Sequence, residues 1–302
     1  MKKVIHYIIL VIYGYKYKLY TIPDIIMSII YRVIPNRKYP VYSAKRMQKY
    51  FDTKKRVYDF NGIYIPELPF EYLYGLGTVY IDNFHIHCRF GNNYGVIDLN
   101  EYDLLAEGPY CYPYDGNNVM IEQGDIVVDA GAWIGDFAAF AIKAGAQKVY
   151  AFEINNDNLK YLNKTAELNP GIAAINAGIG DKNSEVSVNG RNMSAFIEKS
   201  SDDNQGNIKM FSLDSFAESE GITKIDFIKA DIEGFERNML MGAQNILRKF
   251  APKLAICTYH RPDDAEVLTR LIKEANPEYT IVCRKHKLCA WVSDRNNYLA
   301  RQ

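Results

Sequence analysis

The sequence has few cysteines and no net charge. Only five of its 302 residues are cysteine, an odd number, and no two of them stand in a C-x-x-C spacing. A zinc ribbon and a disulfide-stapled secreted domain are therefore disfavoured, and a reducing cytoplasm is the expected compartment. Basic and acidic side chains number 36 each, so a uniformly basic nucleic-acid-binding surface is not expected.

Long hydrophobic runs, internal repeats and low-complexity tracts are also missing. The apolar stretch at residues 5–13 is shorter than the about 20 residues that span a bilayer. No small-residue cleavage site follows it, so a signal peptide is not expected. Hydrophobic residues make up 48% of the chain and charged residues 24%, which is typical of a globular protein. The length predicts one large domain or two ordinary ones.

The overall neutrality hides an asymmetry. Residues 1–60 contain 13 lysines and arginines but only three acidic residues, so the rest of the chain carries a net charge of −10. Tyrosine is skewed in the same direction, with 19 of the 24 before residue 115. A basic, aromatic arm favours an acidic partner, which could be an anionic membrane surface, an anionic glycan or the rest of the chain. A dimer contact or a simple cover for one side of the domain is the alternative.

Hydrophobic periodicity divides the chain at about residue 115. Residues 1–57 are predicted to form short helices broken at prolines, and residues 62–115 to be rich in β-structure because residues 80–87 alternate. After residue 120 strands alternate with helices: strands are expected at 126–129, 148–153, 172–176, 225–230 and 253–259, a helical stripe at 235–250, and a hairpin at 280–283 and 288–292. Alternating units of this length predict an α/β domain over residues 116–302, with a mostly parallel sheet covered on both faces and one added antiparallel strand.

A glycine-containing turn follows the first of these strands. Gly131 and Gly135 allow a tight turn and the close approach of a ligand. The dinucleotide fingerprint G-x-G-x-x-G is not met, because Trp133 and Asp136 occupy two of its glycine positions. Asp129 and Asp136 would also repel a pyrophosphate at the helix start. The turn therefore favours a positively charged nucleoside without phosphates, and S-adenosylmethionine meets both conditions.

A second acidic residue follows the next strand. Glu153 stands 24 residues after Asp129, at the end of the expected strand 148–153. A carboxylate at that strand end can accept hydrogen bonds from both ribose hydroxyls of a nucleoside. The alternative is a solvated loop acid, but the spacing and the strand context together favour the cofactor.

Four segments resemble the FkbM family of S-adenosylmethionine-dependent methyltransferases, namely residues 128–136, 150–153, 176–181 and 227–236. The resemblance extends over residues 120–292, and the segment around Lys229, Asp231, Glu233 and Gly234 is its most specific part. It implies the class I (Rossmann-like) methyltransferase fold, in which a seven-stranded sheet has its last strand antiparallel. An oxygen acceptor, often on a sugar or a natural product, is also implied.

The resemblance implies a set of cofactor-binding residues, which are Asp129, Gly131, Ala132, Trp133, Gly135, Glu153, Ile154, Ala177 and Asp231. The glycine turn would hold the methionine part, Glu153 the ribose, and the loop at 176–181 would pass the adenine. Asp231 would lie beside the transferable methyl group, because open α/β sheets bind ligands at the carboxyl ends of their strands. Trp133 departs from the family, which more often has a smaller polar residue there.

Three predicted catalytic residues, His260, Asp231 and Glu233, converge on this edge. His260 follows the expected strand 253–259, and a histidine near neutral pKa is the natural base for an acceptor hydroxyl. Structural alternatives are a histidine that caps the next helix and carboxylates that stabilise a helix dipole. The three side chains could instead bind a divalent cation. We expect a metal-independent enzyme, because one residue of each type is a weak metal signature.

Lys229, Tyr259 and Arg261 are the predicted acceptor-binding residues. Tyr259 and Arg261 flank His260, and Lys229 lies on the opposite face of its strand from Ala230. Lys229 could bind an acidic acceptor, neutralise the acidic cluster or form a buried ion pair.

The sequence thus predicts a cytoplasmic S-adenosylmethionine-dependent O-methyltransferase that acts on a hydroxyl of a sugar, glycan or related metabolite. The alternatives are a small-molecule N- or O-methyltransferase of another substrate class and a non-catalytic S-adenosylmethionine sensor or scaffold. Nucleic acid is not an expected partner, since the base-flipping motif Asn/Asp-Pro-Pro-Tyr is missing after the fourth strand. Peripheral membrane contact through residues 1–57 and a homo-oligomer remain open.

Overall fold

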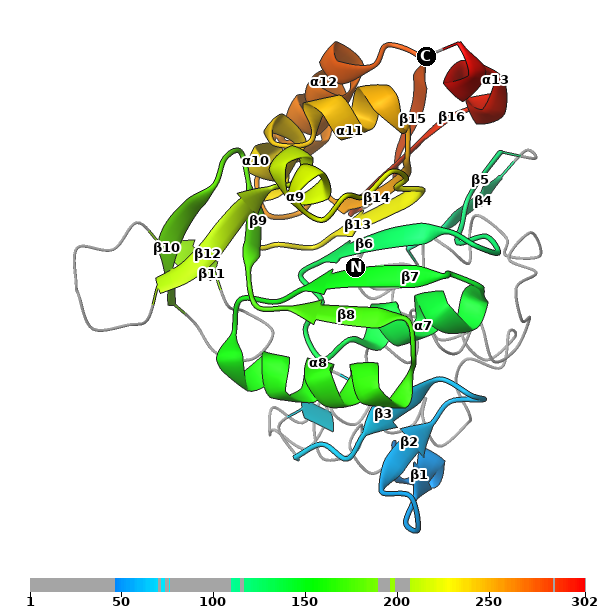
Figure 1. Cartoon of the computed structure of the whole chain (residues 1–302), viewed down its shortest axis with the longest axis vertical. Coiled ribbons are helices and arrows are strands. Elements are labelled where there is room, and N and C mark those ends of the chain that lie inside the picture. The colour runs from blue at the N-terminus through cyan, green and yellow to red at the C-terminus, as the bar shows by residue number, and fades with distance from the viewer. Residues whose placement is uncertain are drawn as a thin grey trace, which may run out of the picture.

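A seven-stranded sheet forms the centre of the protein (Figure 1). The computed structural model describes residues 47–69, 72, 73, 76, 110–114, 117–189, 196–198, 207–284 and 286–301. The order of the strands in the sheet is β15-β16-β14-β13-β6-β7-β8. Their bounds are β6 Ile126–Ala130, β7 Lys148–Phe152, β8 Ile172–Ile175, β13 Phe227–Ala230, β14 Lys253–Cys257, β15 Tyr279–Arg284 and β16 Lys287–Val292. Strand β16 runs antiparallel to both of its neighbours, and the other pairings are parallel. The predicted fold class and hairpin are therefore confirmed.

Helices cover both faces of this sheet. Helices α7 (Asp136–Ala144) and α8 (Asn156–Leu168) lie on one side, and α9 to α12 lie on the other (Figure 1). The bounds of the second group and of the last helix are α9 Leu213–Ser219, α10 Glu236–Met241, α11 Gln244–Lys249, α12 Asp264–Ala275 and α13 Arg295–Ala300. Successive residues of β6 point into different cores: Val127 packs with α7 and α8, and Val128 packs with α9 to α12. This alternation explains why the central strands are apolar at nearly every position.

The predicted helical stripe at residues 235–250 forms two short helices instead of one. Helix α10 ends at Met241, and α11 begins at Gln244. At the break, a Cβ on Gly242 would lie 2.1 Å from the carbonyl oxygen of Gly180. The apolar spacing survives across the break because both helices bury the same side against the sheet.

A small antiparallel sheet precedes the α/β domain. It contains β1 (Phe51–Asp52), β2 (Val57–Asp59) and β3 (Tyr64–Pro66), after a 3₁₀ turn at Gln48–Tyr50. The prediction of helices up to residue 57 is therefore wrong for residues 51–57. The Asp52 carboxylate accepts hydrogen bonds from the backbone N–H groups of Lys54 and Lys55, which closes a turn, and Phe51 packs on Tyr58. This local turn and cross-strand aromatic pair favour a hairpin over a helix.

The small sheet packs on the methyltransferase domain. Asn169, at the end of α8, accepts a hydrogen bond from the Tyr64 N–H and donates to the Tyr64 carbonyl at 2.7 Å. The predicted β-rich character of residues 62–115 stays a prediction. In the described part of that range β3 and β4 (Tyr112–Tyr114) are strands, and β4 forms a hairpin with β5 (Asn117–Val119), but residues 72, 73 and 76 are helical. That hairpin straddles the predicted boundary at residue 116, which stays a prediction.

A second small sheet of four strands was not predicted. It contains β9 (Gly178–Gly180), β10 (Ser184–Asn189), β11 (Phe196–Glu198) and β12 (Asn207–Ser212), in the order β11-β10-β12-β9. The predicted helices before residue 47 and the predicted strand at 80–87 lie outside the described residues. Within the described ranges, every helix is too short or too polar to cross a membrane.

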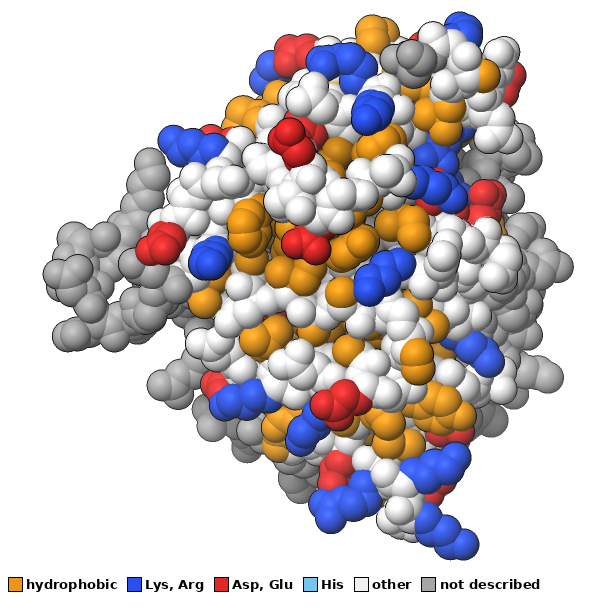
Figure 2. Space-filling view, in the orientation of Figure 1, with side chains coloured by type: hydrophobic (Ala, Val, Ile, Leu, Met, Phe, Trp, Pro, Cys, Tyr) orange, Lys and Arg blue, Asp and Glu red, His pale blue; other side chains and the backbone are white. Residues whose placement is uncertain are grey.

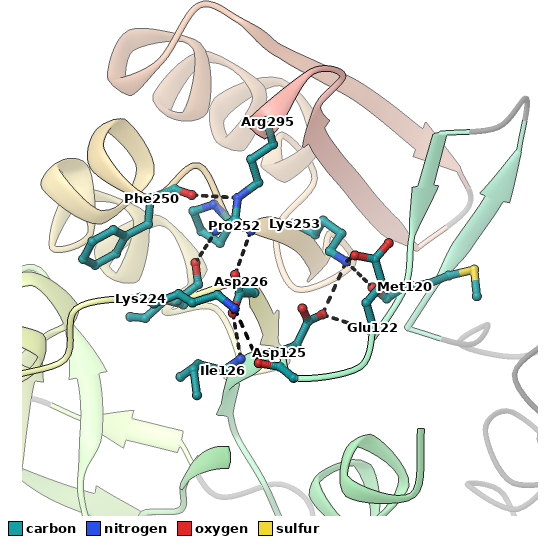
Figure 3. Close-up of polar contacts among 12 residues, drawn as sticks. Met120, Glu122, Asp125, Ile126, Lys224, Asp226, Phe250, Pro252, Lys253 and Arg295 are labelled. Carbon is teal, nitrogen blue, oxygen red and sulfur yellow. Dashed lines mark hydrogen bonds and ion pairs between the residues drawn. The ribbon is translucent and has the colours of Figure 1, made fainter. Parts of the chain in front are cut away.

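A polar network ties together the amino ends of the central strands (Figure 3). Asp226 accepts a hydrogen bond from the Ile126 N–H at 2.8 Å and forms ion pairs with Arg295 at 2.7 Å and Lys224 at 3.0 Å. Burial opposes the ionisation of Asp226, but these partners hold its pKa below the usual value. Lys253 forms a neighbouring pair with Asp125 at 3.3 Å. Basic partners therefore lie against the buried acids at this end of the sheet, although burial still raises the pKa of Asp125.

Two large hydrophobic side chains in the described part of the chain are exposed, Met241 and Tyr259. The space-filling view shows other hydrophobic side chains gathered over the central strands, with charges of both signs around them (Figure 2). Tyr259 follows β14 at the carboxyl end of the sheet, where the predicted site lies. Its ring is 40% exposed, so it is available to a ligand there.

Candidate active site

The predicted site residues come together at the carboxyl ends of four parallel strands. Gly131 follows β6, Glu153 follows β7, Asp231 follows β13, and His260 follows β14 by three residues. The carboxyl ends of β13, β6 and β7 lie level with one another, because Ala130 pairs with Ala230 on one side and with Phe152 on the other. One sheet edge thus presents side chains that are far apart in the sequence.

The glycine turn lies directly against Asp231. Gly131 has a φ of +77°, and a Cβ at this position would be 2.0 Å from the Asp231 carbonyl oxygen. The N–H groups of Gly131 and Ala132 both donate to the carbonyl of Phe152, which holds the turn on β7. Gly135, with a φ of +83°, precedes α7. The turn can thus bring a ligand close to the backbone, as the sequence predicts.

Trp133 and Glu153 form the next part of the site. Trp133 adopts a φ of +48°, which is rare for a residue with a side chain, and its N–H donates to Glu153 Oε2 at 2.8 Å. The other carboxylate oxygen accepts from the Asn155 N–H at 2.7 Å. Glu153 is only 6% exposed, and this burial raises its pKa to about 7. Ile154 beside it is half-buried.

Ala177 marks the far side of the predicted cofactor site. It is buried in the connection between β8 and β9, and its N–H donates to the Ile175 carbonyl at 3.0 Å. The predicted adenine-binding loop, residues 176–181, contains this connection and the short strand β9. The adenine contact predicted for this loop is a matter for ligand binding and stays a prediction.

Behind the turn lies a buried group of charges. Lys229 Nζ is 2.9 Å from Asp129 Oδ1 and donates to the Gly131 carbonyl at 2.6 Å. Both side chains of this pair are buried, which favours the ion-pair interpretation of Lys229 over acceptor binding. Burial also raises the pKa of Asp136 to about 7. Two carboxylates with one lysine leave room for a further positive charge, such as a sulfonium or ammonium group.

Two tyrosines hold the carboxylate of Asp231. Tyr259 donates to Oδ1 and Tyr110 donates to Oδ2, each at 2.9 Å. Burial opposes ionisation of Asp231, but nearby Lys229 and Lys287 lower its pKa below the usual value. Asp231 is therefore a fixed carboxylate beside the glycine turn.

His260 lies among three carboxylates. Its Nε2 is 3.5 Å from Asp231 Oδ1 and 3.4 Å from Glu233 Oε2, and its Nδ1 is 3.0 Å from Glu236 Oε1. Burial favours the neutral ring, but Glu233 and Glu236 outweigh it and raise the His260 pKa to about 10. The structure thus brings together the three predicted catalytic residues and adds Glu236.

The remaining predicted acceptor-binding residue lies at the rim. Arg261 is exposed, and its N–H donates to Asp264 Oδ2 at the start of α12. A Cβ on Gly234 would lie 3.6 Å from Arg261 Nε, so the guanidinium is close to the loop that carries Glu233. Tyr259 packs on His260, with 4.2 Å between the ring centroids.

The sequence analysis missed two residues of this site, Glu236 and Tyr110. Glu236 is the first residue of α10, a position where an acid is commonly explained by the helix dipole. It reaches His260 because Glu233 and Gly234 both have positive φ values and turn the loop back. Tyr110 carried no signal beyond the general surplus of tyrosine before residue 115.

The strand order, the reversed β16 and the acidic site at the carboxyl edge define a class I S-adenosylmethionine-dependent methyltransferase. The family model described as the methyltransferase FkbM domain matches residues 129–279, half of the chain. The chain therefore belongs to the FkbM methyltransferase family, and S-adenosylmethionine is its cofactor.

Similar proteins include one curated relative and several solved structures. The hexuronic acid methyltransferase AglP of Haloferax volcanii is 29% identical over 156 residues, which cover 51% of this chain and 64% of the relative. The chain thus matches less than two thirds of that protein. A crystal structure of methyltransferase FkbM from Methylobacillus flagellatus has 22% identity and a TM-score of 0.49, covering 83% of this chain and 58% of that one. Fibrillarin of Aeropyrum pernix, solved with S-adenosyl-L-methionine, has 15% identity and a TM-score of 0.36, covering 57% of this chain and 68% of that one.

Proposed function

We propose that this methyltransferase transfers the methyl group of S-adenosylmethionine to a hydroxyl of a sugar or glycan. The observation that carries the proposal is the group formed by Asp231, Glu233 and His260 directly beside the Gly131 turn. A carboxylate lies where the methyl donor is expected, and further proton-binding groups lie within 3.5 Å of the imidazole. The match to a hexuronic acid methyltransferase supports a sugar as the acceptor.

The cofactor would lie across the carboxyl ends of β6 and β7. In this proposal the Gly131–Gly135 turn, with Ala132 and Trp133, contacts the methionine part, and Asp129 supplies negative charge behind it. Glu153 would accept hydrogen bonds from the ribose hydroxyls, with Ile154 and Ala177 near the base. Two backbone N–H groups and the Asn158 side chain already bond to the Glu153 carboxylate, which has about four lone-pair sites and so retains acceptor capacity for the ribose.

Methyl transfer is an in-line displacement on carbon, so positioning is the main contribution of the enzyme. The acceptor oxygen forms a bond to the methyl carbon as the sulfur–carbon bond breaks, and the hydroxyl proton must leave. Asp231 and Glu233 are the groups proposed to orient the hydroxyl and draw off that proton. His260 is protonated in the free protein, because its carboxylate neighbours raise its pKa to about 10, and would hold these two carboxylates in place. Tyr259 and Arg261, both exposed at this edge, would contact the rest of the acceptor, and Lys229 would act from behind the turn.

Binding and transfer tests separate the parts of this proposal. Calorimetry of the full chain should show S-adenosylmethionine binding, and labelled cofactor should then methylate members of a panel of neutral sugars, uronic acids and glycans. We expect Asp231→Asn to lower kcat at least tenfold, while Asp263→Asn, an exposed acid paired with Arg237, leaves it unchanged. The product must be an ether that resists mild alkali. Transfer only to amines, or a product that alkali cleaves as an ester, would overturn the hydroxyl acceptor.

The basic N-terminal arm supports a proposed location. Its net charge of +10 over residues 1–60 suits peripheral contact with an anionic membrane, in a cytoplasmic enzyme that forms a homo-oligomer or acts alone. Co-sedimentation with vesicles that contain anionic phospholipid tests the contact, and we expect binding that 0.5 M salt abolishes. Equal binding to neutral vesicles would contradict an electrostatic attachment.

A further inference from the structure

We infer that Asp231, Glu236 and His260 bind a divalent cation of the Mg²⁺ or Mn²⁺ type. The inference rests on the proposed function and assigns the means by which the acceptor hydroxyl is activated. Each of the three side chains offers one ligand atom, and these atoms all lie within 4.8 Å of one another. They come from the end of β13, the start of α10 and the segment after β14.

The spacing of the ligand atoms is that of a shared ion. In octahedral coordination at about 2.1 Å, neighbouring ligand atoms lie about 3 Å apart and opposite ones about 4.2 Å apart. His260 Nδ1 and Glu236 Oε1 are 3.0 Å apart, which suits neighbouring ligands. The imidazole presents only one nitrogen to an ion, so Asp231 enters through the set of one ligand atom per residue, in which all atoms lie within 4.8 Å of one another. Because this limit is slightly wider than the spacing of opposite ligands, a small inward movement of a carboxylate is needed to bring the three onto one ion.

Buried polar atoms in this group lack hydrogen-bond partners. In the described part of the chain, neither ring nitrogen of His260 makes a hydrogen bond, although its side chain is only 8% exposed. Glu236 is fully buried; its Oε1 accepts the Ile232 N–H, and its Oε2 has no donor among the same residues. Buried polar atoms are normally satisfied, so three such atoms in one place point to a ligand.

A simple carboxylate–histidine pair explains this geometry less well. A glutamate that only orients a histidine accepts the ring N–H nearly in line, as in a catalytic triad. Here Glu236 Oε1 is within 3.0 Å of Nδ1 but outside hydrogen-bond geometry. Ligand atoms around one ion behave in this way, because their lone pairs point at the ion and not at each other.

The charge of the group also favours a cation. Asp231, Glu233 and Glu236 bring three carboxylates to one imidazole. Lys229 is paired with Asp129, and Lys287 also acts on Asp231, so the group keeps an excess of negative charge. Oxygen-rich donor sets of this kind suit Mg²⁺ and Mn²⁺. Tyr259 and Tyr110 each donate one hydrogen bond to the Asp231 carboxylate, whose oxygens keep further lone pairs for an ion.

The cation would act as a Lewis acid on the acceptor. The acceptor hydroxyl would bind it through oxygen, which lowers the pKa of that hydroxyl. As the oxygen–methyl bond forms and the sulfur–carbon bond breaks, the sulfonium becomes a neutral thioether, and the proton passes to Glu233 and then to solvent. Glu233 suits this role because it contacts His260 but lies at the exposed rim.

Manganese binding to the full chain tests the inference without any turnover. The chain is treated with EDTA, dialysed and titrated with Mn²⁺ in an electron paramagnetic resonance experiment that counts free ions. We expect one site, with a Kd that rises at least tenfold in Asp231→Asn and in Glu236→Gln. Asp263→Asn is the control, an exposed carboxylate paired with Arg237 that is not a proposed ligand, and its Kd should stay within threefold. Circular dichroism checks that each variant is folded. If Glu236→Gln, at a buried position, does not fold, the result for Asp231→Asn decides.

The outcomes separate this inference from the proposed function. No Mn²⁺ binding at 1 mM, or binding that both ligand variants leave unchanged, overturns the cation site. Undiminished methyl transfer by the EDTA-treated chain overturns its catalytic role, while the sugar methyltransferase stands. Site-specific Mn²⁺ binding without methylation of any sugar or glycan has the opposite meaning: the cation site stands and the proposed acceptor fails.

Discussion

Tyr110 donates a hydrogen bond to Asp231 Oδ2 at 2.9 Å, although 121 residues separate the two in the sequence. Tyr110 lies outside the stretch that matches the FkbM family, and Asp231 lies inside it. The same tyrosine ring faces two buried ammonium groups, Lys287 at 3.9 Å and Lys229 at 5.2 Å from its centroid. The segment before the family domain therefore helps to shape the proposed reaction centre.

Removing this hydroxyl should slow the reaction and spare the cofactor. Tyr110→Phe keeps the ring but leaves Asp231 with one donor fewer, and a hydrogen bond to a charged group contributes about 1.5–3 kcal/mol. We expect kcat to fall about tenfold or more, with the Kd for S-adenosylmethionine within twofold of the wild type. Steady-state kinetics and calorimetry measure the two values. Tyr298→Phe, which removes a hydroxyl bonded to the Arg248 carbonyl far from the site, serves as control. A change in Kd alone would refute this role.

Cofactor affinity should depend on pH through Glu153. Its pKa is raised to about 7 by burial, so the group is protonated below pH 7 in the free protein and ionised above it. Ribose hydroxyls need the carboxylate as acceptor, so affinity should rise with pH. The Kd for S-adenosylhomocysteine should fall about tenfold between pH 6 and pH 8, as expected for one such group. Glu153→Gln should bind weakly at both pH values, and a wild-type Kd that is constant with pH would contradict the assignment.

Gly131 should not tolerate even one methyl group. A Cβ there would meet the Asp231 carbonyl at 2.0 Å, in addition to the strain of a φ of +77°. We expect Gly131→Ala to lose about 2–4 kcal/mol of unfolding free energy and all measurable cofactor binding. Gly221 is a matched control, since its φ is +63° but nothing lies within 4 Å of an added Cβ. Gly221→Ala should cost about 1 kcal/mol or less in urea unfolding, and equal losses for both variants would show that strain alone decides.

The polar network at the amino ends of the strands should contribute to stability and not to cofactor binding. The pKa of Asp226 is lowered in the folded protein, so its contribution is present above the unfolded value of 3.8 and is lost as pH falls below that value. Arg295→Leu should lower the unfolding free energy by about 2–4 kcal/mol at pH 7 and less at pH 3, because the buried carboxylate loses its partner.

A surface pair provides the comparison for this measurement. Arg301 and Glu278 form an exposed ion pair at 3.1 Å, so Arg301→Leu should change stability by less than about 0.5 kcal/mol. Cofactor affinity should be unchanged in both variants, and a loss of affinity in Arg295→Leu would show that the two ends of the sheet are coupled.

The sequence sufficed for the central sheet because its strands carry a strong signal. Buried runs such as 126–130 and 253–257 have apolar residues on both faces, and Gly131 marks where the first of them ends. The break at Gly242 escaped detection because the apolar spacing continues through it. Its cause is a contact with Gly180, 62 positions earlier, which no local pattern records.

The site was predictable as far as the strand ends and not beyond them. Asp231, Glu153 and His260 follow strands, so topology alone brings them together. Glu236 reaches His260 only through the positive φ values of Glu233 and Gly234, and glutamate seldom signals such a conformation. The helical prediction failed at residues 51–57 because a turn capped by the Asp52 side chain decides the local structure there.

The charged groups are arranged differently at the two ends of the sheet, and a bound ligand should therefore also stabilise the fold. Asp226 has its counter-ions built in, whereas burial raises the pKa values of Asp136 and Glu153 to about 7 although Lys229 acts on both. A cationic cofactor adds positive charge beside these carboxylates, so the protein with bound cofactor should resist heat and proteolysis better than the free protein. After methyl transfer the sulfur is neutral, so part of that positive charge, and of the stability it gives, is lost.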